Sequence, residues 1–244
     1  MLNIPFQALC EHQAAQAGTL YVVATPLGNL ADLTLRAIRI LETCDCIACE
    51  TPSCTQRLLS ALDIHSKKLF VYRDAGEEKS AQHLLDSLKN GQSIALVSDA
   101  GTPTISDPGY RLVKLCREQN VPIVPIPGPS AVITALSVSG FPSNSFCFLG
   151  FLPLKPGPRK KIIETYKSFE GTWILYESPY RIHKLVAQLK EWLEPERPIM
   201  IARELTKLNE SFYHGPLATF NEKIFPEKGE FVILVAPYKN KALD

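Results

Sequence analysis

Two carboxylates and several backbone-bending residues meet in the segment VSDAGTPTISDPGY, residues 97–110, directly after the apolar run 93–97. In open α/β sheets, ligands bind beyond the carboxyl ends of the strands, where loops bring backbone amides and small residues against them. The segment therefore predicts a ligand-binding loop after a buried strand. Asp99 either contacts the ligand or caps the turn by accepting hydrogen bonds from its own backbone amides, and the sequence leaves both roles open.

Three further loops with this composition occur in the first half of the chain, at residues 24–29, 125–130 and 140–143. A Pro/Gly turn after a strand is usually only a turn, but four of them in one half of the chain predict the walls of one pocket. Gly101 and Gly109 are expected at positive φ. Ser130 stands at a helix start, where free backbone amides suit an anion.

Apolar strands alternate with amphipathic helices over residues 18–140, the first predicted domain. Strands are predicted at residues 18–24, 46–50, 68–72, 93–97 and 122–125, and helices at 32–43, 52–62, 77–89, 109–119 and 130–138. Such alternation predicts an α/β domain with a mostly parallel sheet that helices cover on both faces.

The pattern changes near residue 140, where we place a domain boundary; a second α/β domain is expected over residues 145–244. Strands are predicted at 146–151, 172–177, 198–203, 211–214 and 230–236, with a helix at 180–192. The close spacing of the last strands predicts antiparallel edges, and hence a mixed sheet. Residues 1–17 are interpreted as a loose N-terminal extension.

The composition narrows the function classes. The 244 residues are 21% charged with a formal net charge of +1, which excludes nucleic-acid binding through global basicity but allows a local basic patch. No apolar run reaches the ~18 residues of a membrane span. Seven cysteines, an odd number, four of which lie along an apolar strand and the helix after it, indicate reduced thiols in the cytoplasm, with no metal site. Phosphate-loop, nucleophile-elbow and zinc-protease motifs are absent.

Six ordered blocks carry a resemblance to a known family. They are GTLYVVATPLGN (18–29), VSDAGTP (97–103), SDPGY (106–110), PIPGPSA (125–131), YESPYR (176–181) and ARELTK (202–207). Together they resemble the ribosomal RNA small subunit methyltransferase I family, which belongs to the tetrapyrrole methylase superfamily. The similarity extends from about Gly18 to Ala236.

The resemblance implies S-adenosylmethionine as methyl donor, bound in a cleft between two α/β domains of a homodimer. It implies as acceptor the ribose 2′-hydroxyl of a cytidine in the decoding centre of 16S rRNA, within the 30S subunit. By position, the donor site falls on Leu27, Asp99, Gly101, Thr102, Ser130, Ala131, Leu175, Tyr176 and Ala202.

The chain departs from the family pattern in two loops. The family usually carries A-E-D-T-R where this chain has Cys49 and Glu50 followed by Thr51-Pro52-Ser53, and a His-rich run where it has Arg73-Asp74-Ala75. These departures keep two alternatives open: a methylase of a small tetrapyrrole-like molecule, and a donor-binding paralogue with lost or altered catalysis.

A ribose hydroxyl is a poor nucleophile and would gain from proton removal. Glu50 and Glu177, with Asp74, are the carboxylates nearest the implied cleft, although ion pairs of Glu50 and Glu177 with Arg181 or Arg203 are the favoured interpretation. RNA contact is predicted for the basic residues after the domain boundary, against the alternative that they form a solvated face. These residues are Lys155, Arg159, Lys160, Lys161 and Arg181.

Overall fold

The computed structural model describes residues 14–73 and 76–237. The chain divides between Ser130 and Ala131 into two compact units, called here unit 1 and unit 2. The sequence placed this boundary near residue 140. The difference arises from helix α6 (Ala131–Val138), which is apolar around most of its surface and packs against strand β10 (Phe231–Val235) of unit 2.

Unit 1 is built on a five-stranded sheet with the order β3-β2-β4-β1-β5. Its strands are β1 (Leu20–Val23), β2 (Cys46–Cys49), β3 (Lys68–Val71), β4 (Ile94–Val97) and β5 (Ile123–Ile126). All neighbouring strands are parallel, which confirms the prediction for this half. Val23 is in register with both Val97 and Ile126, so β1, β4 and β5 end at one edge of the sheet.

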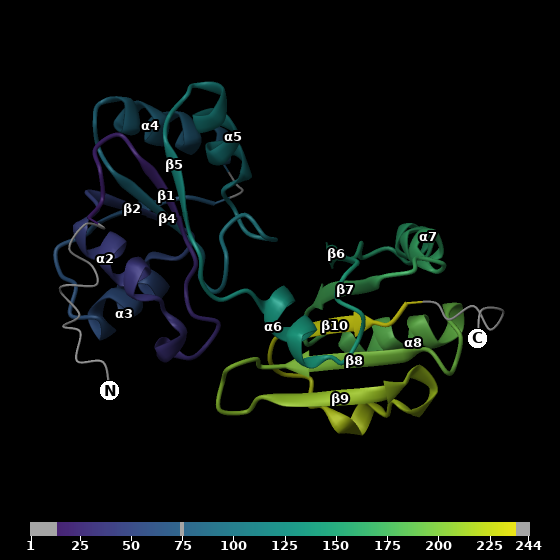
Figure 1. Cartoon of the computed structure of the whole chain (residues 1–244). Helices are drawn as coiled ribbons and strands as arrows, with labels where there is room; N and C mark the ends of the chain where they lie inside the picture. Colours follow the sequence, from purple (N-terminus) through teal and green to yellow (C-terminus); the bar gives the residue numbers. More distant parts are fainter. Residues whose placement is uncertain (1–13, 74–75, 238–244) are drawn as a thin grey trace. The chain divides into compact units, whose positions relative to one another are not determined.

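Two helices cover each face of this sheet (Figure 1). On one face lie α2 (Leu35–Thr43) and α3 (Pro52–Ala61), and on the other α4 (Glu77–Lys89) and α5 (Tyr110–Glu118). Alternate residues of each strand point to opposite faces, so Ala95 and Val97 pack under α2 and α3 while Ile94 and Leu96 pack under α4 and α5. The short 3-10 helix η1 (Leu30–Asp32) follows the loop after β1.

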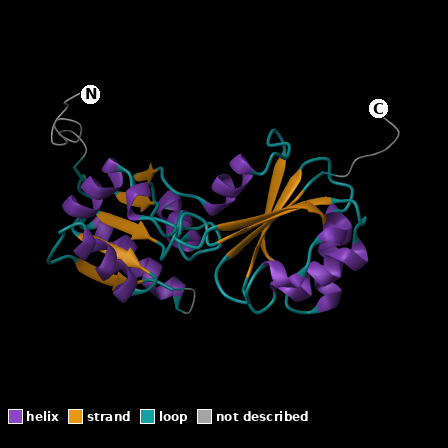
Figure 2. Cartoon of the chain, turned by 90° about the horizontal axis from the view of Figure 1, so that it is seen from below, coloured by secondary structure: helices purple, strands orange, loops and turns teal. Residues whose placement is uncertain are grey.

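Unit 2 holds a second five-stranded sheet with the order β6-β7-β10-β8-β9. The strands of both sheets are orange in Figure 2. Its other strands are β6 (Phe146–Phe151), β7 (Thr172–Glu177), β8 (Pro198–Arg203) and β9 (Ser211–Pro216). β6 and β7 are parallel and the remaining pairs antiparallel, so the sheet is mixed, as predicted. The prediction that both last strands form edges was wrong for β10, which lies centrally between β7 and β8 because its five residues are buried on both faces.

One face of the second sheet packs against α7 (Pro156–Tyr166) and α8 (Ile182–Trp192) in a large apolar cluster. The 3-10 helices η2 (Leu217–Thr219) and η3 (Glu222–Ile224) complete the unit. Among the residues that the structure describes, no helix is long and apolar enough to cross a membrane.

Candidate active site

Three of the four predicted loops are joined at the carboxyl edge of the first sheet. Thr25, after β1, exchanges two backbone hydrogen bonds with Gly101, after β4, at 2.9 and 3.0 Å. The Thr25 hydroxyl also donates to the carbonyl oxygen of Ser98 at 3.1 Å. Thr102 in turn donates from Oγ1 to the carbonyl oxygen of Pro129, after β5, at 3.0 Å. These bonds hold the loops after β1, β4 and β5 in one fixed assembly.

Glycines allow the loops to approach this closely. Gly101 has φ +82°, and a Cβ there would stand 3.2 Å from Cδ2 of Leu27. At Gly128, a Cβ would stand 3.0 Å from Cβ of Ala24. The positive φ predicted for Gly101 and Gly109 is therefore confirmed, since Gly109 has φ +138°. The missing side chains therefore let the backbones of neighbouring loops pack closely together.

The far end of the loop after β4 is anchored by a buried carboxylate. Oε1 of Glu77, in the first turn of α4, accepts hydrogen bonds from the Tyr72 hydroxyl at 2.9 Å and from the backbone amides of Gly109 and Arg111 at 3.3 and 3.4 Å. Its Oε2 pairs with Nε of Arg111 at 3.1 Å. Between the two anchored ends, Thr104 and Ser106 adopt φ of 75° and 68°, which is unfavourable for residues with a Cβ. The anchors therefore hold a strained loop in place.

Asp99 connects this assembly to α3. Its Oδ1 accepts a hydrogen bond from the backbone amide of Thr51 at 3.1 Å, and the Cys54 thiol donates to its carbonyl oxygen at 3.7 Å. Among the hydrogen bonds of the described residues, none joins the Asp99 carboxylate to its own turn. Of the two roles that the sequence left open for Asp99, turn capping is not what these hydrogen bonds show; the carboxylate instead links two strand ends. Asp74 and Ala75, in the second departing loop, lie outside the described residues.

A pocket of about 370 Å³ opens between the loop after β1, helix α3 and the end of β4. Its volume falls in the range of small-molecule sites. The lining residues are Thr25, Pro26, Leu27, Gly28, Leu30, Cys54, Thr55, Arg57, Leu58, Ala61, Val97, Ser98 and Asp99. The α3 residues among them were not predicted from the sequence, because a helix that follows a strand carries no local signal that one of its faces borders a pocket.

The predicted donor residues of unit 2 lie at the ends of β7 and β8. Tyr176 and Ala202 both pair with Val232 of β10, so their side chains share one face of the sheet. Leu175 points to the opposite face and is fully buried in the cluster under α7 and α8. Leu175 can therefore offer a ligand only its backbone, whereas Tyr176 presents a ring, which packs edge-on against Phe148 at 4.8 Å.

The predicted donor residues Ser130 and Ala131 flank the division between the units, with Ala131 as the first residue of α6. The fourth predicted loop, residues 140–143, belongs to unit 2. There the Pro142 carbonyl oxygen accepts from the Thr172 hydroxyl at 2.7 Å, and the Phe141 ring lies 5.3 Å from that of His214. The loop is therefore packed against the second sheet and has a structural role there.

Comparison with known proteins shows to which family the chain belongs. The sequence profile of the tetrapyrrole (corrin/porphyrin) methylases matches residues 19–221. The ribosomal RNA small subunit methyltransferase I of Vibrio cholerae is 49% identical over 92% of this chain and 79% of its own length. The protein of that name from Escherichia coli O157:H7 is 43% identical over 96% of this chain and 84% of its own length. The chain belongs to the ribosomal RNA small subunit methyltransferase I family.

Solved structures share the two-sheet fold. Uroporphyrin-III C-methyltransferase from Thermus thermophilus, complexed with S-adenyl homocysteine, has a TM-score of 0.63 at 17% identity and covers 89% of this chain and 97% of its own. Diphthine synthase has a TM-score of 0.69 at 14% identity and covers 90% of both chains. At these identities the likeness shows the fold alone, which confirms the predicted tetrapyrrole-methylase architecture.

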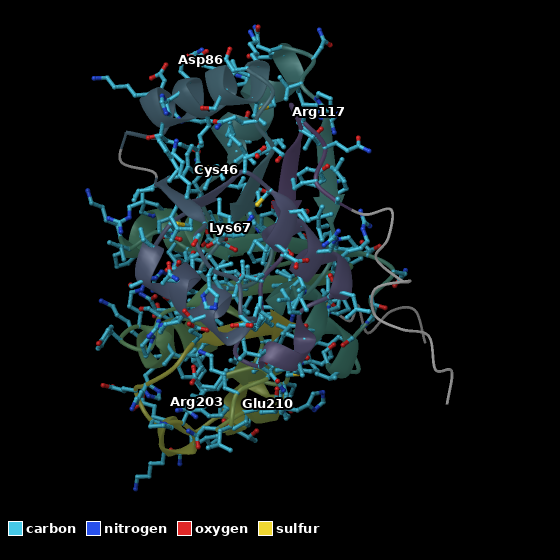
Figure 3. The ribbon with its side chains drawn as sticks, turned by 90° about the vertical axis from the view of Figure 1, so that its left-hand side faces the viewer. Cys46, Lys67, Asp86, Arg117, Arg203 and Glu210 are labelled. Carbon is cyan, nitrogen blue, oxygen red and sulfur yellow. The ribbon has the colours of Figure 1, made fainter. Side chains whose placement is uncertain are left out.

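Within this family framework, the ARELTK block has a structural role. Arg203 and Glu210 (Figure 3) both bond to backbone: Arg203 donates from Nε to the Lys228 carbonyl oxygen at 2.7 Å, and Glu210 accepts from the Thr206 amide at 2.6 Å. Lys207 pairs with Glu204 at 3.1 Å. Burial acts to raise the pKa of Glu204, but the hydrogen bonds from the Glu230 amide and from Lys207 outweigh it and hold the pKa below its usual value. The block stabilises the end of β8.

The YESPYR block is also held internally. Oε1 of the buried Glu177 pairs with Nη2 of Arg181 at 2.5 Å and accepts from the Ser178 amide at 2.8 Å. The predicted Glu177–Arg181 ion pair is therefore confirmed. Glu50 is partly buried, and its carbonyl oxygen accepts from Nε of Arg73 at 2.8 Å. The guanidinium of Arg203 donates to backbone carbonyl oxygens. The alternative ion pairs of Arg203 with Glu50 or Glu177 are therefore not formed among these contacts.

The basic residues predicted for RNA contact separate into two groups. Arg159 is 1% exposed, and its guanidinium donates to the Pro153 carbonyl oxygen at 2.9 Å and to Oε1 of Gln188 at 2.7 Å. The expectation that Arg159 lies on an RNA-facing surface was wrong, because its side chain is built into unit 2. Lys155, Lys160 and Lys161 are exposed, whereas Arg181 is largely engaged with Glu177.

Proposed function

We propose that this chain is an S-adenosylmethionine-dependent methyltransferase that modifies the ribose 2′-hydroxyl of a cytidine in the decoding centre of 16S rRNA. The proposal rests on the joined loops after β1, β4 and β5 in a chain of this family. We further propose that it acts on the 30S subunit in the cytoplasm, as a homodimer.

The chemistry of the loops suits the donor. When bound, S-adenosylmethionine supplies an electrophilic methyl group on a positively charged sulfur. The exposed carboxylate of Asp99 places a negative charge at the loop assembly, and among the described residues only its Oδ1 is engaged, by the Thr51 amide. The absence of a Cβ at Gly101 lets the loop after β4 pack directly against Leu27. We assign to the donor site Leu27, Asp99, Gly101, Thr102, Ser130 and Ala131 from these loops, together with Leu175, Tyr176 and Ala202.

Positioning is the main catalytic task that this chain performs. Methyl transfer is accelerated when the acceptor oxygen is aligned with the methyl group and water is excluded. Fixed loops serve that purpose because they lose little conformational entropy on binding. Glu177 serves as a structural ion-pair partner of Arg181, and we assign no catalytic base.

The deciding experiment is incubation of the purified protein with labelled S-adenosylmethionine and unmethylated 30S subunits, followed by nucleotide mapping. Label on the 2′-oxygen of one decoding-centre cytidine is the expected result. Label on a porphyrinoid but not on 30S subunits would support a small-molecule acceptor. Donor binding without transfer to either would support a paralogue that has lost catalysis.

A further inference from the structure

The pocket of unit 1 contains a cation that the assigned donor site does not use. Arg57 lies on α3, lines the pocket and is exposed. Among the described residues, no hydrogen bond or ion pair engages its guanidinium. An unpaired arginine at a pocket mouth is a ready binding group for phosphate, which its planar fork contacts through two parallel hydrogen bonds.

The rest of the pocket wall is mostly apolar. One face of α3 supplies Cys54, Leu58 and Ala61, at helical spacing, and the loop after β1 supplies Leu27 and Leu30 opposite. Unpaired bases of RNA are bound by splaying them out of the strand into such surfaces, while the sugar-phosphate backbone is held by basic and polar groups. The pocket thus combines a surface for a base with a charge for a phosphate.

We propose that this pocket receives the acceptor nucleotide, with its base between α3 and the loop after β1 and a backbone phosphate on Arg57. The inference deepens the proposed function and rests on it. Arg57 is assigned as an acceptor-positioning residue, and Leu30, Leu58 and Ala61 as the contacts of the base.

The location of the pocket meets the geometric demand of methyl transfer. The reacting atoms of donor and acceptor must lie within roughly 3.5 Å of each other. Leu27 and Asp99 line the pocket and also belong to the assigned donor loops. Leu27 also lies close to Gly101, since a Cβ on Gly101 would stand 3.2 Å from its Cδ2. An acceptor in the pocket therefore lies directly against the loops assigned to the donor.

Cys54 provides a direct measure of pocket occupancy. It lines the pocket and is only partly buried. Burial raises the pKa of Cys44 and of Cys116 to about 11, and also raises the pKa of Cys46 and Cys49. The thiolate is the reactive form, so these four thiols alkylate slowly at neutral pH. Cys147 of unit 2 is also partly buried and lies outside the pocket, which makes it the internal reference.

The first test measures alkylation of Cys54 with N-ethylmaleimide by peptide mass spectrometry. Saturating fluorescein-labelled oligocytidylate, with binding followed by anisotropy, is expected to slow Cys54 alkylation about tenfold and leave Cys147 unchanged, because a filled pocket excludes the reagent. Unchanged alkylation of Cys54 at full RNA occupancy would overturn the proposal. Protection by S-adenosylhomocysteine alone, and not by RNA, would overturn it as well and assign the pocket to the donor.

The second test compares Arg57→Ala with Arg117→Ala. Arg117 is an exposed arginine on α5, at the opposite face of the first sheet, and serves as the matched control (Figure 3). Arg57→Ala is expected to raise the KM for 30S subunits about tenfold, as loss of one charge-assisted contact does, with the Kd for S-adenosylmethionine unchanged. Arg57→Lys should recover part of the loss. Equal KM values for both alanine variants would contradict the assignment.

The outcomes separate this inference from the proposed function. Methylation of 30S subunits by the parent, with Cys54 unprotected and Arg57→Ala behaving as Arg117→Ala, would leave the function standing and reject the pocket assignment. Protection of Cys54 by oligocytidylate without methylation of 30S subunits would support a nucleotide pocket and reject the proposed reaction.

Discussion

Asp99 accepts a hydrogen bond from the backbone amide of Thr51, with 3.1 Å between Oδ1 and N. The contact spans two strand ends, because Thr51 precedes α3 and Asp99 follows β4. Thr51-Pro52-Ser53 is also where this chain departs from the A-E-D-T-R pattern that the family usually carries. The departure therefore lies directly against the loop assigned to the donor, on the side of the pocket that contains Arg57.

Two substitutions of Asp99 separate its hydrogen bond from its charge. Asp99→Asn keeps an oxygen that can accept from the Thr51 amide, so its free energy of unfolding should stay within about 0.5 kcal/mol of the parent. Asp99→Ala removes the acceptor and should cost about 1 kcal/mol. Both remove the negative charge and should weaken binding of the cationic donor, measured by calorimetry on the folded protein. If Asp99→Asn binds the donor as tightly as the parent, Asp99 only links the two loops.

A methyl group at Gly101 should disturb the donor loops. Gly101→Ala would place a residue with a Cβ at φ +82° and 3.2 Å from Leu27, whereas Gly91→Ala has a similar φ of +88° with nothing within 4 Å. Both should lose about 1 kcal/mol from the left-handed backbone alone. Only Gly101→Ala should also weaken donor binding, because Leu27 must move. Equal donor affinity in the two variants would show that Leu27 has room to adjust.

Glu77 is expected to control the loop after β4 from its far end. Glu77→Ala leaves the Tyr72 hydroxyl and the backbone amides of Gly109 and Arg111 without their shared acceptor, which should lower the free energy of unfolding by about 3 kcal/mol. Tyr72→Phe removes one of these donors and should cost about 1 kcal/mol. Denaturant unfolding measures both. Similar losses in the two variants would mean that Glu77 does not hold the loop.

The sequence predicted unit 1 more completely than unit 2, for a physical reason. In unit 1 each strand is followed by a helix, so the parallel sheet and the common edge of its loops follow from local alternation. In unit 2 the central place of β10 depends on pairing with β7 and β8, which no local pattern encodes. The prediction of an edge position for β10 was wrong because strands that are close in sequence, as β9 and β10 are, need not be neighbours in the sheet.

Single charged residues were the least predictable features. Arg159 stands beside two lysines and has the local pattern of a solvated helix face, yet it is buried. Its burial is possible only because Gln188, on the next helix, and the Pro153 carbonyl oxygen accept its hydrogen bonds. The role of Arg57 could not be predicted from the sequence, because the pocket that it lines forms only when the loop after β1 folds beside α3.

Glu177 and Arg181 should behave as a structural pair. Arg181→Ala leaves the buried Glu177 carboxylate without its ion-pair partner and should lower the free energy of unfolding by about 3 kcal/mol or more. The double variant Glu177→Gln/Arg181→Met removes both charges and should lose clearly less than Arg181→Ala alone. Equilibrium unfolding tests this order. A structural Glu177 also predicts that Glu177→Gln leaves the shape of the pH–rate profile for methylation unchanged. Loss of one limb of that profile would instead identify Glu177 as the base.

The exposed lysines after the unit boundary supply the last prediction, which concerns RNA. Replacing Lys155, Lys160 and Lys161 with alanine should weaken binding of 30S subunits. The plot of log K against log salt should also become less steep, by about 2 in slope, since each lost phosphate contact with a single strand removes about 0.7. Donor affinity should not change. Arg159→Ala should act differently, because removal of a buried guanidinium destabilises the fold by about 3 kcal/mol, while the protein that remains folded binds 30S subunits with the parental salt slope. A triple lysine variant with an unchanged slope would show that these lysines form only a solvated face.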